Sequence, residues 1–208
     1  MIIRLKPISN KFFEKAYEAA MLDLNKFFGQ NWIYSRPNIY LINDRKTYDL
    51  IQGKKTESWM VGYTSGNNVY LMDYRNFEKE SCHKYSKEYY SALIKHELAH
   101  IFTLYKCSNS YYPTWLWEGV AIFASDQLNQ YKRPDKLKNF LHFYKIHKDE
   151  VGSVYNEAGY AVEFLVKKYG KVKLFDLLEG IEKDMSEANF AKLFKKTYSI
   201  PLEYKSFN

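Results

Sequence analysis

Cysteine is scarce in this sequence. Its 208 residues include two cysteines, Cys82 and Cys107. Two are too few for the disulfide framework that stabilises small secreted domains, and neither belongs to a Cys-x-x-Cys pair of the kind found in redox motifs and zinc knuckles. We therefore expect two free thiols.

Long apolar runs are also missing. Nowhere do 18 consecutive apolar residues occur, so the sequence predicts no transmembrane helix. The opening residues 1–7, Met-Ile-Ile-Arg-Leu-Lys-Pro, lack the uninterrupted apolar segment of a secretory leader. The default expectation is a cytoplasmic protein, with secretion left open if a leader once preceded these residues.

Arginine and clustered charge are sparse as well. The formal net charge is +7, from 31 basic and 24 acidic residues, yet only five of the basic residues are arginine and no run of five like charges occurs. Nucleic-acid binding relies on clustered basic side chains, so we expect no nucleic-acid partner. The 46% hydrophobic and 26% charged composition is that of an ordinary folded protein, and 208 residues favour one domain of two lobes.

The spacing of apolar residues predicts an α+β protein. In the first half it predicts helices over residues 11–28, 44–52 and 86–106, and strands over 39–42, 59–63 and 69–72, the last two forming a hairpin. In the second half it predicts helices over residues 115–128, 135–147, 157–169, 172–183 and 186–198. We expect an α/β lobe over residues 1–106 followed by a helical lobe over residues 107–208.

The expected helix over residues 86–106 contains the sequence His-Glu-Leu-Ala-His at positions 96–100. Residues four apart lie on one face of a helix with Cβ atoms about 5 to 6 Å apart, so His96 and His100 can bind one metal ion. Glu97 lies at the edge of the same face, outside the first coordination shell, where it can act as a general base towards water. In one chain of this length and composition, chance alone would produce about 0.008 such motifs.

A catalytic zinc ion usually has three protein ligands, so a third ligand must lie elsewhere. The metzincin extension would place Gly and His at positions 103 and 106, but these are Thr103 and Lys106. Eighteen residues after His100, Glu118 stands near the start of the next expected helix. Gly119 and Ala121 are small enough to let that helix approach the first closely. Glu118 is therefore our predicted third ligand.

The pair of segments His-Glu-Leu-Ala-His and Trp-Leu-Trp-Glu-Gly-Val-Ala, at 96–100 and 115–121, resembles the gluzincins, and in particular small zinc metallopeptidases of the MA-like group. The resemblance covers roughly residues 60–183. It implies a zincin-like fold with the active-site helix in the N-terminal lobe, a Zn²⁺ cofactor held by His96, His100 and Glu118, and hydrolysis of peptide bonds with Glu97 as the base.

The same resemblance implies two further features. A tyrosine or histidine near the zinc donates a hydrogen bond to the oxyanion of the intermediate in these enzymes, and Tyr155, with Tyr160 behind it, is the candidate. The substrate pairs with an edge strand just before the active-site helix, which by position is the strand over residues 69–72. His142 and His147, five apart on an expected helix, are out of phase and are not placed in the site, nor is His83.

Several alternatives stay open at this stage. The chain could keep a zinc site without turnover and act as a binding module, or it could be a regulatory peptidase specific for one intracellular protein. The first 55 residues match nothing in the resemblance and could be a prosegment, an inhibitory lobe or scaffold. Substrate, endopeptidase or exopeptidase action, and oligomeric state are not determined by these patterns.

Overall fold

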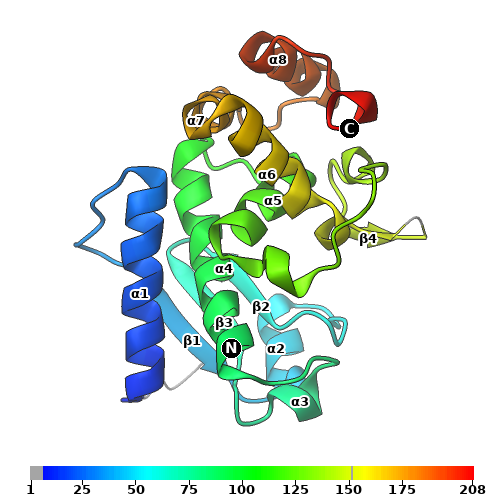
Figure 1. Cartoon of the computed structure of the whole chain (residues 1–208). Helices are drawn as coiled ribbons and strands as arrows, with labels where there is room; N and C mark the ends of the chain where they lie inside the picture. The colour runs from blue at the N-terminus through cyan, green and yellow to red at the C-terminus, as the bar shows by residue number, and fades with distance from the viewer. Residues whose placement is uncertain (1–6, 151) are drawn as a thin grey trace.

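The computed structural model describes residues 7–150 and 152–208 (Figure 1). Most of the opening segment on which the expectation of an absent leader rests, residues 1–6, lies outside this range. The protein is mixed α/β, with about 53% helix and a small sheet. Among the described helices, none combines the length and the apolar composition that a bilayer crossing requires.

Strands and helices alternate in the first half of the chain, and helices dominate the second. The strands are β1 (Asn38–Ile42), β2 (Gly62–Ser65), β3 (Asn68–Met72), β4 (Lys148–Asp149) and β5 (Gly152–Ser153). The helices are α1 (Lys11–Phe28), α2 (Arg45–Gln52), α3 (Phe77–Glu80), α4 (Lys87–Lys106), α5 (Thr114–Ala124), α6 (Ala158–Tyr169), α7 (Lys171–Glu179) and α8 (Glu187–Tyr198). Short 3-10 helices cover Gln127–Gln130, Phe140–His142, Val154–Asn156 and Tyr204–Ser206.

The three-stranded sheet has the order β1-β3-β2. β1 is parallel to β3, while β2 is antiparallel to β3 through the predicted hairpin, in which Ser65 pairs with Asn68. The prediction that residues 69–72 form the edge strand is therefore wrong. β3 is central because α2 returns the chain so that β1 pairs with its other side, a long-range pairing that local spacing does not encode.

Local sequence signals place the ends of several helices as predicted. The Ser86 hydroxyl accepts a hydrogen bond from the backbone N–H of Tyr89 at 3.0 Å and so begins α4. α1 ends at Gly29, whose φ of 65° is the left-handed conformation that glycine adopts most readily. The predicted helices over 157–169, 172–183 and 186–198 correspond to α6, α7 and α8.

α4 is the central helix of the protein. It is buried almost all round from His96 to Leu104, as expected for a helix enclosed by other elements. α1 packs along one side of it, α5 along another, and β2 and β3 contact a third (Figure 1). Both of its predicted metal-binding residues therefore lie deep inside the protein and not on its surface.

The predicted helix over residues 135–147 does not form, so the second half is less helical than predicted. That stretch holds only the 3-10 helix Phe140–His142, and β4 pairs with β5 after it. Tertiary hydrogen bonds explain the difference. The Glu157 carboxylate accepts from three successive backbone N–H groups, those of Lys138, Asn139 and Phe140. These donors are satisfied by a distant side chain and not by helix carbonyls.

α5 also ends earlier than predicted, at Ala124 instead of residue 128. Asp126, two residues further on, has a φ of 61°, a left-handed conformation that stops an α-helix. The chain then continues as the 3-10 helix Gln127–Gln130, and the Leu128 carbonyl of this helix accepts a hydrogen bond from the Tyr160 hydroxyl of α6.

Candidate metal centre and active-site cleft

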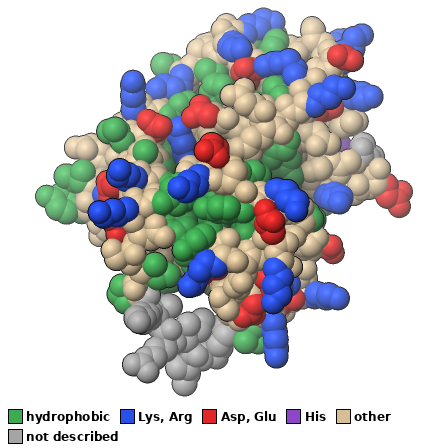
Figure 2. Space-filling model, turned by 60° about the horizontal axis from the view of Figure 1, so that its bottom comes forward, with side chains coloured by type: hydrophobic (Ala, Val, Ile, Leu, Met, Phe, Trp, Pro, Cys, Tyr) green, Lys and Arg blue, Asp and Glu red, His purple; other side chains and the backbone are tan. Residues whose placement is uncertain are grey.

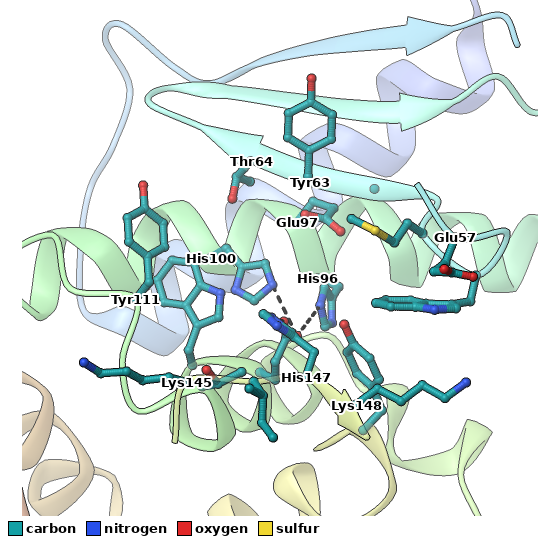
Figure 3. Close-up of a pocket in the computed structure, with 18 of the residues that line it drawn as sticks. Glu57, Tyr63, Thr64, His96, Glu97, His100, Tyr111, Lys145, His147 and Lys148 are labelled. Atoms are coloured by element: carbon teal, nitrogen blue, oxygen red, sulfur yellow. Dashed lines mark ion pairs between the residues drawn. The ribbon is translucent and has the colours of Figure 1, made fainter. Parts of the chain in front are cut away.

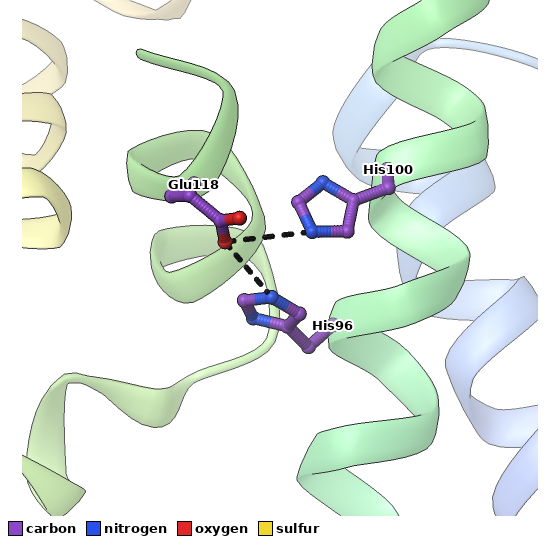
Figure 4. Close-up of side chains that lie close together, drawn as sticks. All are labelled: His96, His100 and Glu118. Atoms are coloured by element: carbon purple, nitrogen blue, oxygen red, sulfur yellow. Dashed lines mark ion pairs between the residues drawn. The ribbon is translucent and has the colours of Figure 1, made fainter. Parts of the chain in front are cut away.

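His96 and His100 on α4 face Glu118 on α5 (Figure 4). The Glu118 Oε2 atom lies 3.3 Å from Nε2 of His96 and 3.5 Å from Nε2 of His100. All three side chains are buried, with 6%, 5% and 4% of their surface exposed. The structure thus brings together the three residues that the sequence predicted as ligands.

The spacing of these atoms fits a tetrahedral ion. Ligand atoms 2.0 to 2.1 Å from a zinc ion at tetrahedral angles lie about 3.3 to 3.4 Å from one another, close to the two distances in this cluster. All three ligand atoms lie within 4.8 Å of one another. Two imidazoles and one carboxylate are also a donor set that suits zinc, whereas calcium and magnesium prefer oxygen alone. The group can therefore hold a metal ion.

Aromatic packing orients one of the two imidazoles. The His100 ring lies flat against Trp117, with ring centroids 4.4 Å apart and an interplanar angle of 9°. Trp117 itself is 7% exposed and precedes Glu118 on α5. The helix that supplies the carboxylate therefore also supplies the surface on which one histidine rests.

Gly119 does not contribute directly to the contact between α4 and α5, although the sequence predicts that it does. A Cβ atom at Gly119 would lie 2.5 Å from the Ala158 carbonyl oxygen and 2.8 Å from Cγ2 of Val162, both in α6. The missing side chain therefore lets α6, and not α4, approach α5. Gly119 still fixes the position of Glu118, since α6 holds α5 from behind.

The charges of the cluster influence one another strongly. Burial would raise the pKa of Glu118, but hydrogen bonds and charge interactions with His100, His147 and His96 hold it well below its usual value. Burial lowers the pKa of His100 to about 4. Burial opposes protonation of His96 too, yet the Glu118 carboxylate raises the pKa of His96 overall. Glu118 is thus an anion, and His100 offers a neutral ring, the forms that bind metals.

Glu97 lies directly beneath strand β2. A Cβ atom added at Gly62 would stand 2.4 Å from its Oε1 atom. The side chain is 5% exposed, and its Oε2 atom has no hydrogen-bond partner. Burial raises the pKa of this carboxyl group to about 7, against the lowering effect of His96. Such a value suits a group that exchanges protons near neutral pH.

These residues open into a cleft of about 1000 Å³. Figure 3 shows β2 with Tyr63 and Thr64 on one side of the cleft, and the segment carrying Lys145, His147 and Lys148 on the other. The metal cluster and Glu97 lie between the two sides. The cleft also contains aromatic side chains, namely Trp59, Tyr111, Tyr112, Trp117 and Tyr155.

β2 presents its free edge to this cleft. The backbone N–H of Met72 donates to the Val61 carbonyl at 2.8 Å. Because hydrogen-bonded pairs alternate in an antiparallel ladder, the N–H and C=O groups of Gly62 and Thr64 point away from β3. Both residues line the cleft. The strand available for pairing is therefore β2, which replaces the predicted strand over residues 69–72.

His147 is a site residue that sequence reasoning missed. Its Nε2 atom lies 3.1 Å from the Glu118 Oε1 atom, and its side chain is 45% exposed in the cleft. Helical phase excludes His147 from the predicted site, but its segment is not a helix. The start of α5 instead donates backbone hydrogen bonds to Tyr144 and Phe143 at 2.8 and 2.9 Å. That contact carries His147 to Glu118, and no local pattern would have revealed it.

The two tyrosine candidates differ in their position relative to the cleft. Tyr155 lines the cleft, with its ring 5.9 Å from that of Trp59. Burial, together with the Glu118 and Glu97 carboxylates, raises its pKa well above the usual value, so its phenol keeps its proton. Tyr160 is wrong as a reserve: its hydroxyl lies 2.9 Å from the Leu128 carbonyl and 2.6 Å from that of Tyr131, outside the cleft.

The remaining histidines have structural contacts. His83 lies with Nε2 3.0 Å from the Trp59 carbonyl and Nδ1 3.2 Å from the Tyr89 hydroxyl, and so holds the segment before β2. His142 pairs with Asp149, next to the β4–β5 hairpin. Both cysteines are free, Cys82 exposed and Cys107 buried.

The described part of the first 55 residues packs against the rest of the protein. α1 packs on α4, and among residues 7–55 only Lys54 lines the cleft. Lysine and arginine side chains are dispersed among acidic and neutral ones on the face shown in Figure 2, in agreement with their scatter along the sequence.

Comparison with protein-family models, with curated proteins and with solved structures found no match to this chain.

Proposed function

We propose that this protein is a zinc-dependent peptidase of the gluzincin type. The observation that carries the proposal is the buried group of His96, His100 and Glu118, which has the spacing of a tetrahedral site and opens into a cleft next to Glu97. A zinc ion held there would supply Lewis acidity, which makes water a better acid and polarises a carbonyl group.

Glu97 is the general base of the proposed reaction. It cannot be a ligand alongside His96 and His100, because it points from the neighbouring position of α4 towards β2. Its carboxylate takes the proton from the attacking water and passes it to the leaving amine of the peptide bond. The raised pKa makes this group able both to accept and to release the proton near neutral pH.

Strand β2 is the proposed platform for the substrate backbone. A peptide that adds to this edge as an extra strand would use the backbone groups of Gly62 and Thr64, which the sheet leaves unpaired. Backbone pairing would place the scissile peptide bond next to Glu97 whatever side chains the peptide carries. Selectivity then depends on the aromatic and basic residues along the cleft, such as Trp59, Tyr111 and Lys145.

Tyr155 and His147 are the proposed donors to the oxyanion that develops at the peptide carbonyl. Tyr155 holds its proton over the whole working range, as a donor must. The Nε2–H group of His147 faces the Glu118 carboxylate, so only the imidazolium form of this ring, which borders the same cleft, has a second N–H, at Nδ1, to donate to the oxyanion. Donors placed where negative charge develops contribute several kcal/mol to a barrier, or about 100- to 1000-fold in rate.

The test combines metal analysis with the substitution Glu97→Gln. We expect one zinc ion per chain in both proteins, and peptide hydrolysis by the wild type that falls by several orders of magnitude in the variant. Zinc binding without any hydrolysis, on a peptide panel and on cell proteins, would identify a binding module instead. Cleavage of one native protein but of no panel peptide would indicate a regulatory peptidase. Equal activity in both proteins would end the proposal.

A further inference from the structure

Three successive backbone carbonyls just before β2 have hydrogen-bond partners in side chains that are distant in the sequence. The Ser58 carbonyl accepts from Nη2 of Arg45 at 3.3 Å, and the Met60 carbonyl accepts from Nη1 of the same guanidinium at 2.7 Å. The Trp59 carbonyl between them lies 3.0 Å from Nε2 of His83. This stretch contains no helix or strand, so long-range bonds, and not a local ladder, satisfy its carbonyls.

Arg45 makes two of these bonds and uses every donor that it has. Its Nε and Nη2 atoms donate to the Glu80 carbonyl at 3.1 and 2.8 Å, and Nη1 also donates to the Thr56 hydroxyl at 3.1 Å. Together with the bonds to Ser58 and Met60, these occupy the five N–H groups of the guanidinium. A planar fork whose directions are all used fixes its acceptors relative to one another. Arg45 therefore ties the chain before β2 to the end of α3.

Helix α2 also anchors the beginning of this stretch. The backbone N–H of Thr56 donates to Oδ1 of Asp49 at 2.8 Å. Arg45 and Asp49 are four residues apart in α2, so they lie on one face of the helix. One helix face thus holds residues 56–60 at both ends. The stretch lines the cleft through Glu57, Trp59 and Met60.

The same bonds decide where the free edge of β2 ends. Met60 has no unpaired backbone group, because its N–H donates to the Glu57 carbonyl at 3.0 Å and its carbonyl accepts from Arg45. At the other end of the strand the chain turns into β3. The free edge therefore consists of Gly62 and Thr64, between a stop at one end and a turn at the other.

We propose that Arg45 is a positioning residue for substrate binding, which ends the free edge of β2 at Gly62 and fixes the wall of the cleft before it. A substrate chain then pairs with Gly62 and Thr64 alone. Beyond Gly62, side chains such as Trp59 can contact the substrate, whereas the carbonyls of this wall already have donors. The inference rests on the proposed peptidase function, and in particular on β2 as the platform for the substrate.

The length of the free edge is tested with N-methylated peptides. The probe is the panel peptide that the wild type cleaves fastest, with a single N-methyl group placed at each backbone nitrogen in turn. Binding is measured on the inactive Glu97→Gln variant, so that cleavage does not interfere. The N–H groups of an added strand that face β2 recur at every second residue. We expect binding to weaken at two positions of this series, and fewer or more than two would overturn the inference.

The role of Arg45 is tested with Arg45→Leu, which removes the donors, and with Arg45→Lys, which keeps the charge but not the fork. Arg36→Leu is the matched control, because Arg36 also forms a fork, to Glu18 of α1 at 3.0 and 3.1 Å, but outside the cleft. The measurements are kcat, KM and zinc affinity, together with amide hydrogen exchange at Thr56, at Met60 and along α1.

We expect Arg45→Leu to raise KM about 10-fold, because the edge is no longer held ready for the substrate, with kcat and zinc affinity nearly unchanged. Hydrogen exchange should accelerate at Thr56 and Met60 but not along α1. Arg45→Lys should show a smaller rise in KM, and Arg36→Leu should show none.

An unchanged KM in Arg45→Leu would overturn the inference. So would hydrogen exchange that accelerates equally at Thr56 and along α1, since that is the result of a merely structural role. If Arg45→Leu does not fold, Arg45→Lys and the N-methyl series decide. If the wild type cleaves no peptide, the proposed function fails, and the exchange rates at Thr56 and Met60 still decide whether Arg45 fixes this part of the chain.

Discussion

Gly62 of β2 and Glu97 of α4 are in direct contact, and the contact is possible only because residue 62 has no side chain. A Cβ atom there would lie 2.4, 2.8 and 2.9 Å from Oε1, Cδ and Cγ of Glu97. The free edge of the sheet is thereby brought down onto the carboxylate that the proposed reaction needs. The distance between β2, the proposed substrate-binding strand, and Glu97, the proposed base, is set by a glycine.

The substitution Gly62→Ala should therefore reduce hydrolysis with little effect on zinc content. Gly62 does not have a positive φ, so alanine fits the backbone and the added methyl group must displace Glu97 or lift β2. A small misplacement of a catalytic group costs roughly 10- to 100-fold in rate. The measurement is kcat and KM together with metal analysis. Gly180→Ala is the control, since a Cβ atom there would also crowd a side chain, with Cδ1 of Leu193 at 2.7 Å, but outside the cleft; equal losses in both variants would contradict the prediction.

Removing the charge of Glu118 should abolish tight zinc binding. Glu118→Gln keeps the shape but offers no anion to the metal, so we expect zinc affinity to fall by at least about 100-fold. Glu157→Gln is an informative comparison, because Glu157 is equally buried but accepts hydrogen bonds from the backbone of residues 138–140. This second variant should lower Tm and leave zinc affinity unchanged. Similar zinc affinities in wild type and Glu118→Gln would remove Glu118 from the ligand set.

The raised pKa of Glu97 predicts how the stability of the metal-free protein depends on pH. Burial raises this pKa from 4.5 to about 7, so the folded protein binds this proton more tightly than the unfolded chain. The resulting stabilisation is complete below pH 4.5 and is lost as the pH rises through 7. Glu97→Gln has no proton to lose. Between pH 4.5 and pH 8, the free energy of unfolding of Glu97→Gln should therefore increase relative to that of the wild type by up to about 3 kcal/mol.

Urea unfolding of the two chelator-treated proteins across this pH range measures the difference. Parallel stability curves would show that Glu97 is not buried as a neutral acid. A gap that widened towards low pH would have the opposite sign and would equally contradict the prediction.

Substitutions at Tyr155 and His147 should separate binding from catalysis. Tyr155→Phe keeps the ring that contacts Trp59 but loses the hydroxyl proton. We expect kcat to fall about 100- to 1000-fold with KM nearly unchanged, as for the loss of an interaction made only in the transition state. An increase in KM alone would show that Tyr155 contributes only to binding.

His147→Asn should give a different pattern. It removes the ring that contacts Oε1 of Glu118, so a loss of kcat is expected together with a modest loss of zinc affinity. Zinc titration of Tyr155→Phe and His147→Asn distinguishes the role of the tyrosine from that of the histidine. Full activity in His147→Asn would leave Tyr155 as the single proposed donor.

Local chemistry in the sequence determined much of this protein. The spacing of His96 and His100 requires only that residues four apart share a helix face, and Ser86 and Gly29 mark helix ends through hydrogen bonds and conformations that involve their immediate neighbours. Glu118 could be chosen because it stands in a short recognisable segment. These features depend on interactions over a few residues, which the order of the amino acids expresses directly.

Only the tertiary structure decided the features that depend on residues far apart in the chain. β3 is central because β1 pairs with it across α2, so β2 becomes the free edge. Residues 135–147 are not helical because Glu157 and the start of α5 take their backbone hydrogen bonds, and this is what brings His147 to Glu118. In each case a long-range hydrogen bond or contact outweighs local periodicity, and no window of sequence contains both partners.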